Sequence, residues 1–265
     1  MKQGYSHCPS RVKKSPTRQP HTPRVYRNGA VRGAIIGVVA EALRVARPTN
    51  VRASAPRSCD AVGPHPELCV FDLDACLWDK EMFEMSAVPT AEDIVMGDLN
   101  GRGEGVRGVM SGGDKISLHS GALIALQEHS DGKYPGMRIA LASSADTPFA
   151  EKVGRAALTF LEVRPELTVW DMLMKDWDGV DVNQIGRQPP LSSSKAATHF
   201  PRLREATGIA YDRMLFYDDC NWGDHCGKVA AACKEPSGKG VVTQRTPRGL
   251  QEADWRNGMK KYATS

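Results

Sequence analysis

The sequence lacks the cysteine spacing of a zinc site or of a disulfide framework. Its seven cysteines stand at positions 8, 59, 69, 76, 220, 226 and 233, so none forms a C-x-x-C pair and their number is odd. Zinc-binding cysteines usually occur in such pairs, and disulfide scaffolds usually have an even number. His225 beside Cys226 does not make a ligand pair, because adjacent residues do not share a helix face. We therefore expect neither a zinc site nor a disulfide-stapled fold.

A long hydrophobic run is also missing. The longest uncharged apolar run, residues 33–40, is far shorter than the roughly 20 residues that cross a bilayer. Hydrophobic residues make up 41% and charged residues 25% of the 265 positions, which is ordinary for a globular protein of one or two domains. We expect no membrane partner.

Acidic residues are almost missing from the first 58 positions, which carry 12 Lys and Arg but a single acid, Glu41. The remaining chain has 23 basic and 30 acidic residues, so no nucleic-acid partner is expected. An Arg-rich leader without acids is similar to an organelle transit peptide, and Ala53-Ser54-Ala55 is similar to a processing site. We expect residues 1–58 to direct the protein to a plastid or mitochondrion. The alternative is a disordered basic tail on a cytoplasmic protein.

Two short apolar runs each end in a pair of carboxylates. Leu68-Cys69-Val70-Phe71 precedes Asp72 and Asp74, and Met214-Leu215-Phe216-Tyr217 precedes Asp218 and Asp219. Such runs of β-formers predict buried strands. Residues i and i+2 share a strand face, so we expect Asp72 and Asp74 to point into one site. Open α/β sheets bind ligands at the carboxyl ends of their strands, and Mg²⁺ is the natural compensation for carboxylates gathered there.

Between these runs lie two further groups that suit phosphate. The apolar run 137–142 ends at Ser143 and Ser144, whose hydroxyls can donate to a phosphate oxygen. Lys195 opens a helical pattern over 195–206, and the start of a helix is a favourable place for an anion. Each signal is weak alone, and their order along the chain strengthens them.

That order, Asp-x-Asp, then Ser, then Lys, then Asp-Asp, resembles the haloacid dehalogenase superfamily of phosphatases. The segment from Phe71 to Trp78 is similar to the magnesium-dependent phosphatase family of acid phosphatase type. The segments Thr198-His199-Phe200 and Ala206-Thr207-Gly208-Ile209 support the same resemblance, which covers roughly residues 66–245.

The resemblance implies a role for each residue. Asp72 would be the nucleophile that forms an aspartyl-phosphate, and Asp74 the general acid and base. Ser143, with Ser144 beside it, and Lys195 would hold the phosphoryl oxygens. Mg²⁺ would be bound by Asp72, the backbone carbonyl of Asp74, and the pair Asp218 and Asp219.

Three departures from the family pattern stand close to these residues. Cys76 replaces a usual threonine, Cys220 replaces a usual acidic residue, and Lys195 lies one residue further from His199 than in the family. Both thiols would lie near the same metal, so Cys76 and Cys220 are candidates for a reversible disulfide.

Alternating strands and helices predict an α/β fold with three layers, Rossmann-like, around a parallel sheet. We expect one phosphatase domain over 59–265, with residues 79–119 forming a minimal β-hairpin cap insertion. The strands are expected at about 68–73, 137–142, 180–185, 213–217 and 241–243. The helices are expected at 121–128, 148–161, 195–206, 224–232 and 249–259.

The sequence therefore predicts a Mg²⁺-dependent phosphatase. Its substrate would be a phosphoprotein side chain or a small phosphorylated sugar or amine, and the sequence does not choose between them. One alternative is a non-catalytic binding module that kept the fold, and another is a phosphomutase that shares the aspartyl-phosphate chemistry. The oligomeric state stays open.

Overall fold

The computed structural model describes residues 63–265. Residues 1–62, which contain the expected basic leader and its processing site, lie outside the described part. The transit peptide therefore stays a prediction. None of the described helices is both long enough and apolar enough to cross a membrane.

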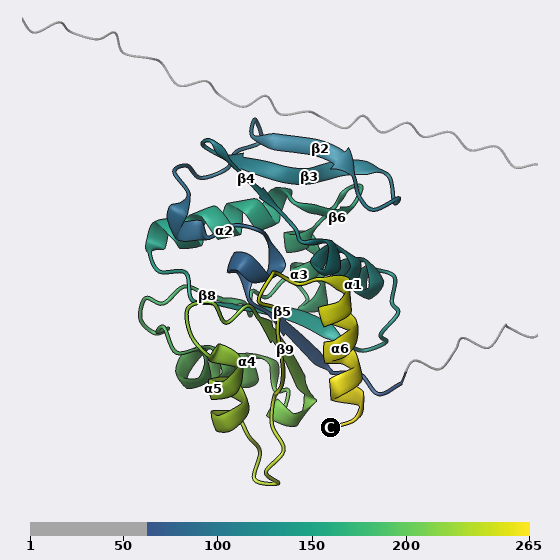
Figure 1. Ribbon diagram of the computed structural model, residues 1–265, viewed down its shortest axis with the longest axis vertical. Coiled ribbons are helices and arrows are strands. Elements are labelled where there is room, and N and C mark those ends of the chain that lie inside the picture. Colours follow the sequence, from purple (N-terminus) through teal and green to yellow (C-terminus); the bar gives the residue numbers. More distant parts are fainter. Residues whose placement is uncertain (1–62) are drawn as a thin grey trace, which may run out of the picture. The chain divides into compact units, whose positions relative to one another are not determined.

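A five-stranded sheet forms the centre of the described part (Figure 1). Its strands lie in the order β10-β9-β1-β5-β8, and each neighbouring pair is parallel. The predicted α/β class with a parallel sheet is thus confirmed, although β8 is shorter than expected. The strands are β1 (Leu68–Phe71), β5 (Arg138–Ser143), β8 (Gln184–Ile185), β9 (Met214–Asp218) and β10 (Val242–Arg245).

The central strand β1 is apolar on both of its faces. Leu68 and Val70 belong to one buried cluster, whereas Cys69 and Phe71 belong to another. A parallel sheet needs such strands because helices cover both of its sides. The continuous apolar run in the sequence is therefore the signature of a strand buried between two layers.

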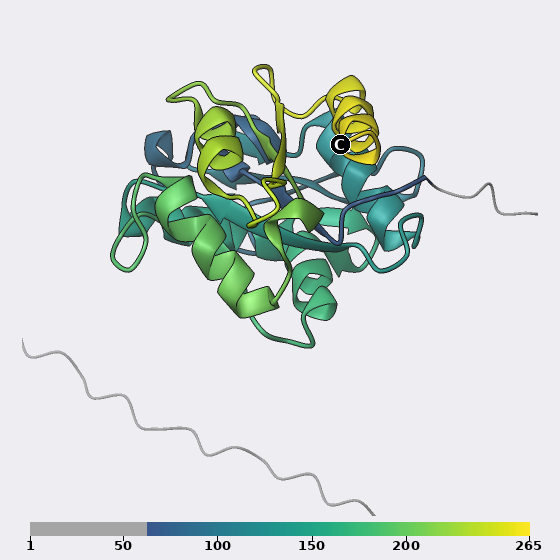
Figure 2. The same cartoon turned by 90° about the horizontal axis from the view of Figure 1, so that it is seen from below.

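Helices pack on the two faces of the sheet (Figures 1 and 2). The first cluster is completed by α1 (Ser120–Ser130), α2 (Pro148–Phe160), α3 (Val169–Asp176) and α6 (Glu252–Ala263). The second is completed by α4 (Phe200–Thr207) and α5 (His225–Ala232). Helix α3 was not predicted, although Thr168 and Asp171 form a capping box at its start.

The insertion predicted within residues 79–119 is confirmed as a small antiparallel sheet. It has three strands instead of the two of a hairpin: β2 (Ile94–Asp98), β3 (Glu104–Ser111) and β4 (Asp114–Ser117). Gly112, with a φ of +62°, makes the tight turn between β3 and β4, a conformation that favours glycine. The short pair β6 (Glu162–Arg164) and β7 (Leu167–Thr168) was not predicted.

Glu128, a residue of α1, connects this helix to the C-terminal helix α6 through hydrogen bonds. Its carboxylate accepts from Arg256 at 2.6 Å, Trp255 at 2.8 Å, Tyr134 at 2.9 Å and Lys133 at 2.7 Å. Burial alone would raise the pKa of Glu128, but these four donors outweigh it and lower the pKa to about 2. The carboxylate therefore favours the folded state in its charged form.

We predict that Glu128→Gln removes an acid-dependent part of the stability. A depressed folded-state pKa stabilises above the ordinary value of 4.5, and this stabilisation is lost as the pH falls toward 2. The loss near neutral pH should be about 2 kcal/mol, reduced from the full shift because Arg256 and Lys133 are partly exposed. Urea unfolding at about pH 7 and about pH 3 measures it, since parent and variant should converge in acid.

The matched control is Glu252→Gln, which removes an exposed partner of the same Arg256. An exposed pair contributes at most about 1 kcal/mol, so this variant should follow the parent at both pH values. The prediction is contradicted if the free energies of unfolding of Glu128→Gln and the parent differ by the same amount at every pH.

Candidate active site

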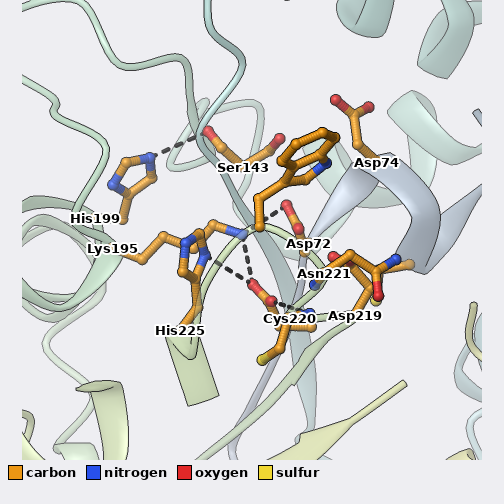
Figure 3. A network of polar contacts seen from close by, with 12 residues as sticks. Asp72, Asp74, Ser143, Lys195, His199, Asp219, Cys220, Asn221 and His225 are labelled. Carbon is orange, nitrogen blue, oxygen red and sulfur yellow. Dashed lines mark hydrogen bonds and ion pairs between the residues drawn. The ribbon is translucent and has the colours of Figure 1, made fainter. Parts of the chain in front are cut away.

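The carboxyl ends of three neighbouring strands bring the predicted site residues together (Figure 3). Asp72 follows β1 directly, Ser143 ends β5 and Asp218 ends β9. The register pairs Phe71 with residues one or two positions before these ends on both neighbouring strands, so all three ends lie at one edge of the sheet. This is the edge at which open α/β sheets place their ligands.

Lys195 lies between two of the carboxylates. Its Nζ is 2.8 Å from Asp72 Oδ1 and 2.6 Å from Asp218 Oδ2 (Figure 3). The lysine is only 2% exposed, and burial alone would lower its pKa. The two carboxylates outweigh burial and raise the pKa above its ordinary value, so the ammonium stays charged.

The pKa values of the two partners of Lys195, Asp72 and Asp218, are shifted in opposite directions. Burial raises the pKa of Asp72 to about 7, with Lys195 opposing and with Asp218 and Asp219 adding to the rise. Burial would also raise the pKa of Asp218, but Lys195 and His225 hold it below its ordinary value. Of these two partners, Asp72 is therefore the one that takes up a proton more readily.

The carboxylates of Asp72, Asp218 and Asp219 form a group that could hold a metal ion. One oxygen from each lies within 4.8 Å of the others, and all three residues are buried. When ionised they carry three negative charges against the single positive charge of Lys195, which leaves an excess of two. Hard divalent cations such as Mg²⁺ prefer oxygen ligands of this kind, so the residues fit such an ion.

Asp74 reaches the site by a different route from the one expected. The strand ends at Phe71, and residues Leu73–Leu77 form a tight turn in which Ala75 has a φ of +49°. The argument from a shared strand face is therefore wrong, although Asp72 and Asp74 line the same cavity. The Asp74 carboxylate is not among the three carboxylates that could hold a metal ion. It accepts a hydrogen bond from Trp78 Nε1 at 3.0 Å.

Asp74 favours its protonated form. Burial raises its pKa well above the ordinary value, and the nearby charge of Asp72 adds to the rise. The donors Trp78 Nε1–H and Met82 N–H oppose this effect without cancelling it. A half-buried carboxyl that keeps its proton next to an ionisable neighbour is suited to general-acid work.

His199 is a site residue whose role the sequence reasoning missed. Its Nε2 lies 3.1 Å from two backbone carbonyls, those of Ser143 and Gly186. Carbonyls only accept, so Nε2 carries the proton, and burial lowers the pKa of the ring to about 4. The neutral imidazole thereby ties the turn that bears Lys195 to the end of β5. The Thr-His-Phe motif was the only signal for it.

The extra residue between Lys195 and His199 is accommodated by the shape of the helix start. Residues Lys195–His199 form a π-helical turn, closed by the Phe200 N–H to the Lys195 carbonyl. A π turn contains one residue more than an α turn, so the inserted residue is absorbed locally. The Lys195 ammonium consequently reaches the carboxylates despite the departure from the family spacing.

The site opens into a cavity of about 470 Å³. Lys195 does not line it, and its ammonium is buried between Asp72 and Asp218. From residues 79–119 only Glu81 and Phe83 reach the cavity, and the strands β2, β3 and β4 add nothing to its wall. Its lining includes the predicted Asp72, Asp74, Ser143, Ser144, Asp218 and Asp219.

A family model described as Acid Phosphatase matches residues 64–265, nearly all of the described part. The chain belongs to this acid phosphatase family. The resemblance to the haloacid-dehalogenase-like, magnesium-dependent acid phosphatases is thereby confirmed. No curated protein matches the chain. Membership supports phosphatase activity on a phosphorylated substrate.

The two cysteines that depart from the family pattern have separate neighbours. Cys76 Sγ accepts from Thr246 Oγ1 at 3.3 Å, whereas Cys220 Sγ accepts from the Cys226 backbone N–H at 3.4 Å. Cys220 also donates its backbone N–H to Asp218 Oδ1 at 2.8 Å. The structure gives no contact that would support a pairing of Cys76 with Cys220.

We predict that Lys195→Met destabilises the fold most at neutral pH. Removing one partner of a buried ion pair leaves unpaired carboxylates and costs roughly 3 kcal/mol or more. The pKa of Asp72 then rises further and that of Asp218 rises from its lowered value, so the variant regains stability relative to the parent as falling pH protonates them. Urea unfolding near neutral pH and at about pH 5 measures both effects.

Lys80→Met is the matched control, because Lys80 pairs with Asp114 at 3.0 Å in an exposed position. The free energy of unfolding of this variant should stay close to that of the parent at either pH, because water screens an exposed pair. An equal loss of unfolding free energy in Lys195→Met and Lys80→Met contradicts the stabilising role given to the buried contacts of Lys195.

Proposed function

We propose that the protein is a Mg²⁺-dependent phosphatase that hydrolyses a phosphomonoester through an aspartyl-phosphate on Asp72. One observation carries the proposal: Asp72 and Asp218 share the buried Lys195 ammonium beside Asp219, at a cavity that Asp74 also lines. A nucleophile, an acid and a cation-binding group are thus available to one bound phosphate. Family membership supports the same reaction class.

Asp72, Asp218 and Asp219 would hold the magnesium ion, with the backbone carbonyl of Asp74 as a further ligand. The bound ion would supply positive charge between the nucleophilic carboxylate and the phosphate dianion. The same charge would lower the pKa of Asp72, which burial otherwise raises to about 7, and keep it ionised.

In the first step the Asp72 carboxylate attacks phosphorus, and the bond from phosphorus to the leaving oxygen breaks. Asp74 gives its proton to that oxygen, so the leaving group departs as an alcohol. In the second step Asp74 takes a proton from a water molecule that attacks the same phosphorus. This releases inorganic phosphate and regenerates the Asp72 carboxylate.

Ser143 and Ser144 would donate hydroxyls to the phosphoryl oxygens at the end of β5. Lys195 would act from its buried position between Asp72 and Asp218: its charge would lower the net negative charge that the phosphate meets and hold Asp72 in place for attack. This differs from the direct phosphate contact that the family pattern implies, because Lys195 is not at the cavity surface.

Hydrolysis is favoured over the two alternatives. A phosphomutase has to keep water from its phospho-enzyme, whereas here none of the insertion strands β2, β3 and β4 contributes a residue to the cavity wall. Against a binding module speaks the presence of both carboxylate pairs, Asp72 with Asp74 and Asp218 with Asp219, in one cavity. The substrate would be a phosphoprotein side chain or a small phosphorylated sugar or amine.

We predict that Asp72→Asn lowers phosphatase turnover by about 10³-fold or more, because an amide is a poor nucleophile and a weak metal ligand. A colorimetric phosphate-release assay on the parent should also lose its signal with a chelator and regain it with Mg²⁺. Asp178→Asn, an exposed residue outside the cavity, is the control and should match the parent. Variant activity within about tenfold of the parent refutes the nucleophile assignment.

Asp74→Asn should instead discriminate between leaving groups. An alkyl phosphate, whose leaving oxygen needs the proton, should lose about 10²-fold or more in the first step, and nitrophenyl phosphate should lose less. Rapid-quench measurement of the first turnover isolates that step. The cavity-lining Asp146→Asn serves as control. Equal losses for both substrates in Asp74→Asn contradict the general-acid role.

A further inference from the structure

Two exposed aromatic rings stand at the mouth of the cavity. Trp222 is 76% exposed and Phe83 is 46% exposed, and both line the cavity that contains Asp72. Their ring centroids are 6.0 Å apart in an edge-to-face arrangement. The other large exposed apolar residues of the described part, Ile94, Met96, Phe149 and Val180, do not line this cavity.

The position of the indole is fixed by polar contacts. Trp222 Nε1 donates to Glu81 Oε1 at 3.0 Å, which joins the loop after β9 to the segment that carries Phe83. On the same loop, the Asn221 backbone N–H donates to Asp219 Oδ2 at 2.7 Å. The rings are therefore held at the site before any ligand arrives, which lowers the entropy cost of contacting one.

The rings also lie on the side of the cavity at which the leaving group departs. The backbone amide of Met82, the residue before Phe83, lies close enough to the Asp74 carboxylate to oppose the rise of its pKa, and Asp74 and Phe83 line the same cavity. Asp74 is the proposed proton donor to the leaving oxygen, so the leaving group has to pass close to this segment. Buried Met82 anchors the segment, whereas Phe83 beside it stays exposed toward the cavity.

Neither ring serves the hydrophobic core. A large aromatic ring left mostly in water forgoes the free energy that its burial would supply, and two in contact form an apolar patch. Aromatic rings bind flat apolar groups by stacking or edge-to-face contact. The hydroxyls of a polyol placed against the same surface would lose water without gaining partners.

We propose that Trp222 and Phe83 determine the leaving-group specificity of the enzyme, by binding the ring of an aryl phosphate in preference to a polyol phosphate. This inference rests on the proposed phosphatase reaction and adds the residues that select its substrate. The phosphoryl group binds at the carboxylates, and the aryl ring of the leaving group packs against the indole and the phenyl ring.

The test compares each substrate with itself across variants, so that differences in leaving-group reactivity cancel. For Trp222→Ala, kcat/KM with phenyl phosphate should fall roughly tenfold, whereas kcat/KM with glycerol phosphate should change less than about twofold. Phe83→Ala should likewise lower the ratio of kcat/KM for phenyl phosphate to kcat/KM for glycerol phosphate. Trp222→Phe keeps a ring but loses the N–H to Glu81, and should retain most of the preference.

Phe149→Ala is the matched control, because Phe149 is an aromatic residue that is 42% exposed and lies outside the cavity. It should leave the ratio unchanged. Calorimetric binding of phenylphosphonate and methylphosphonate to the Mg²⁺-loaded parent and to Trp222→Ala gives a readout that needs no turnover. Loss of affinity for phenylphosphonate alone is expected.

The outcomes separate this inference from the proposed function. A parent that hydrolyses neither substrate refutes the phosphatase reaction, and the phosphonate measurements then still show whether the rings bind an aryl group. An active parent in which Trp222→Ala weakens both substrates equally overturns the specificity role. Identical behaviour of Trp222→Phe and Trp222→Ala overturns it as well, because the Glu81 contact would then account for the effect.

Discussion

The contact of the Lys195 ammonium with Asp72 and Asp218 is the interaction on which the site depends. It joins three separate parts of the chain: the residue after β1, the end of β9 and the π turn before α4. Buried charges are tolerated only when they are paired, so each of these three groups requires the other two in place. The sheet order, which sets β1 beside β9, makes the pairing possible.

The remaining contacts hold this group in one geometry. His199 connects the lysine-bearing turn to the Ser143 carbonyl, and Trp78 holds the Asp74 carboxyl. Burial raises the pKa of Asp72 and Asp74, whereas Lys195 keeps the pKa of Asp218 low. Carboxyl groups that line one cavity are thereby given different protonation behaviour by their surroundings, as the proposed division into a nucleophile and an acid requires.

Much of the sheet could be predicted because its signals are local. The apolar runs before Asp72 and Asp218 identified strands buried on both faces, and their ends located the site. Helix α3 was missed because its eight residues give only a short periodic pattern, although Thr168 and Asp171 marked its start. Boundary errors of one to three residues are usual where helices and strands end.

What the sequence could not give were contacts between distant segments. The spacing of Lys195 from His199 differed from the expected family pattern but did not reveal the π turn that contains both residues. The contact of Trp222 with Glu81 joins residues 141 positions apart and has no local pattern. The position of Lys195 between Asp72 and Asp218 likewise depends on how the strands and the turn pack in three dimensions.

The placement of β1 has a consequence for how the protein is made. This strand leaves the ribosome first among the described elements, yet its neighbour β9 starts at Met214 and its Phe71 ring packs against Trp255 of α6. Strand pairing over such separations is slow, and the exposed apolar run attracts other chains meanwhile. β1 can pair with β5 earlier, but its second edge and the Phe71 ring find their partners only after β9 and α6 have been synthesised.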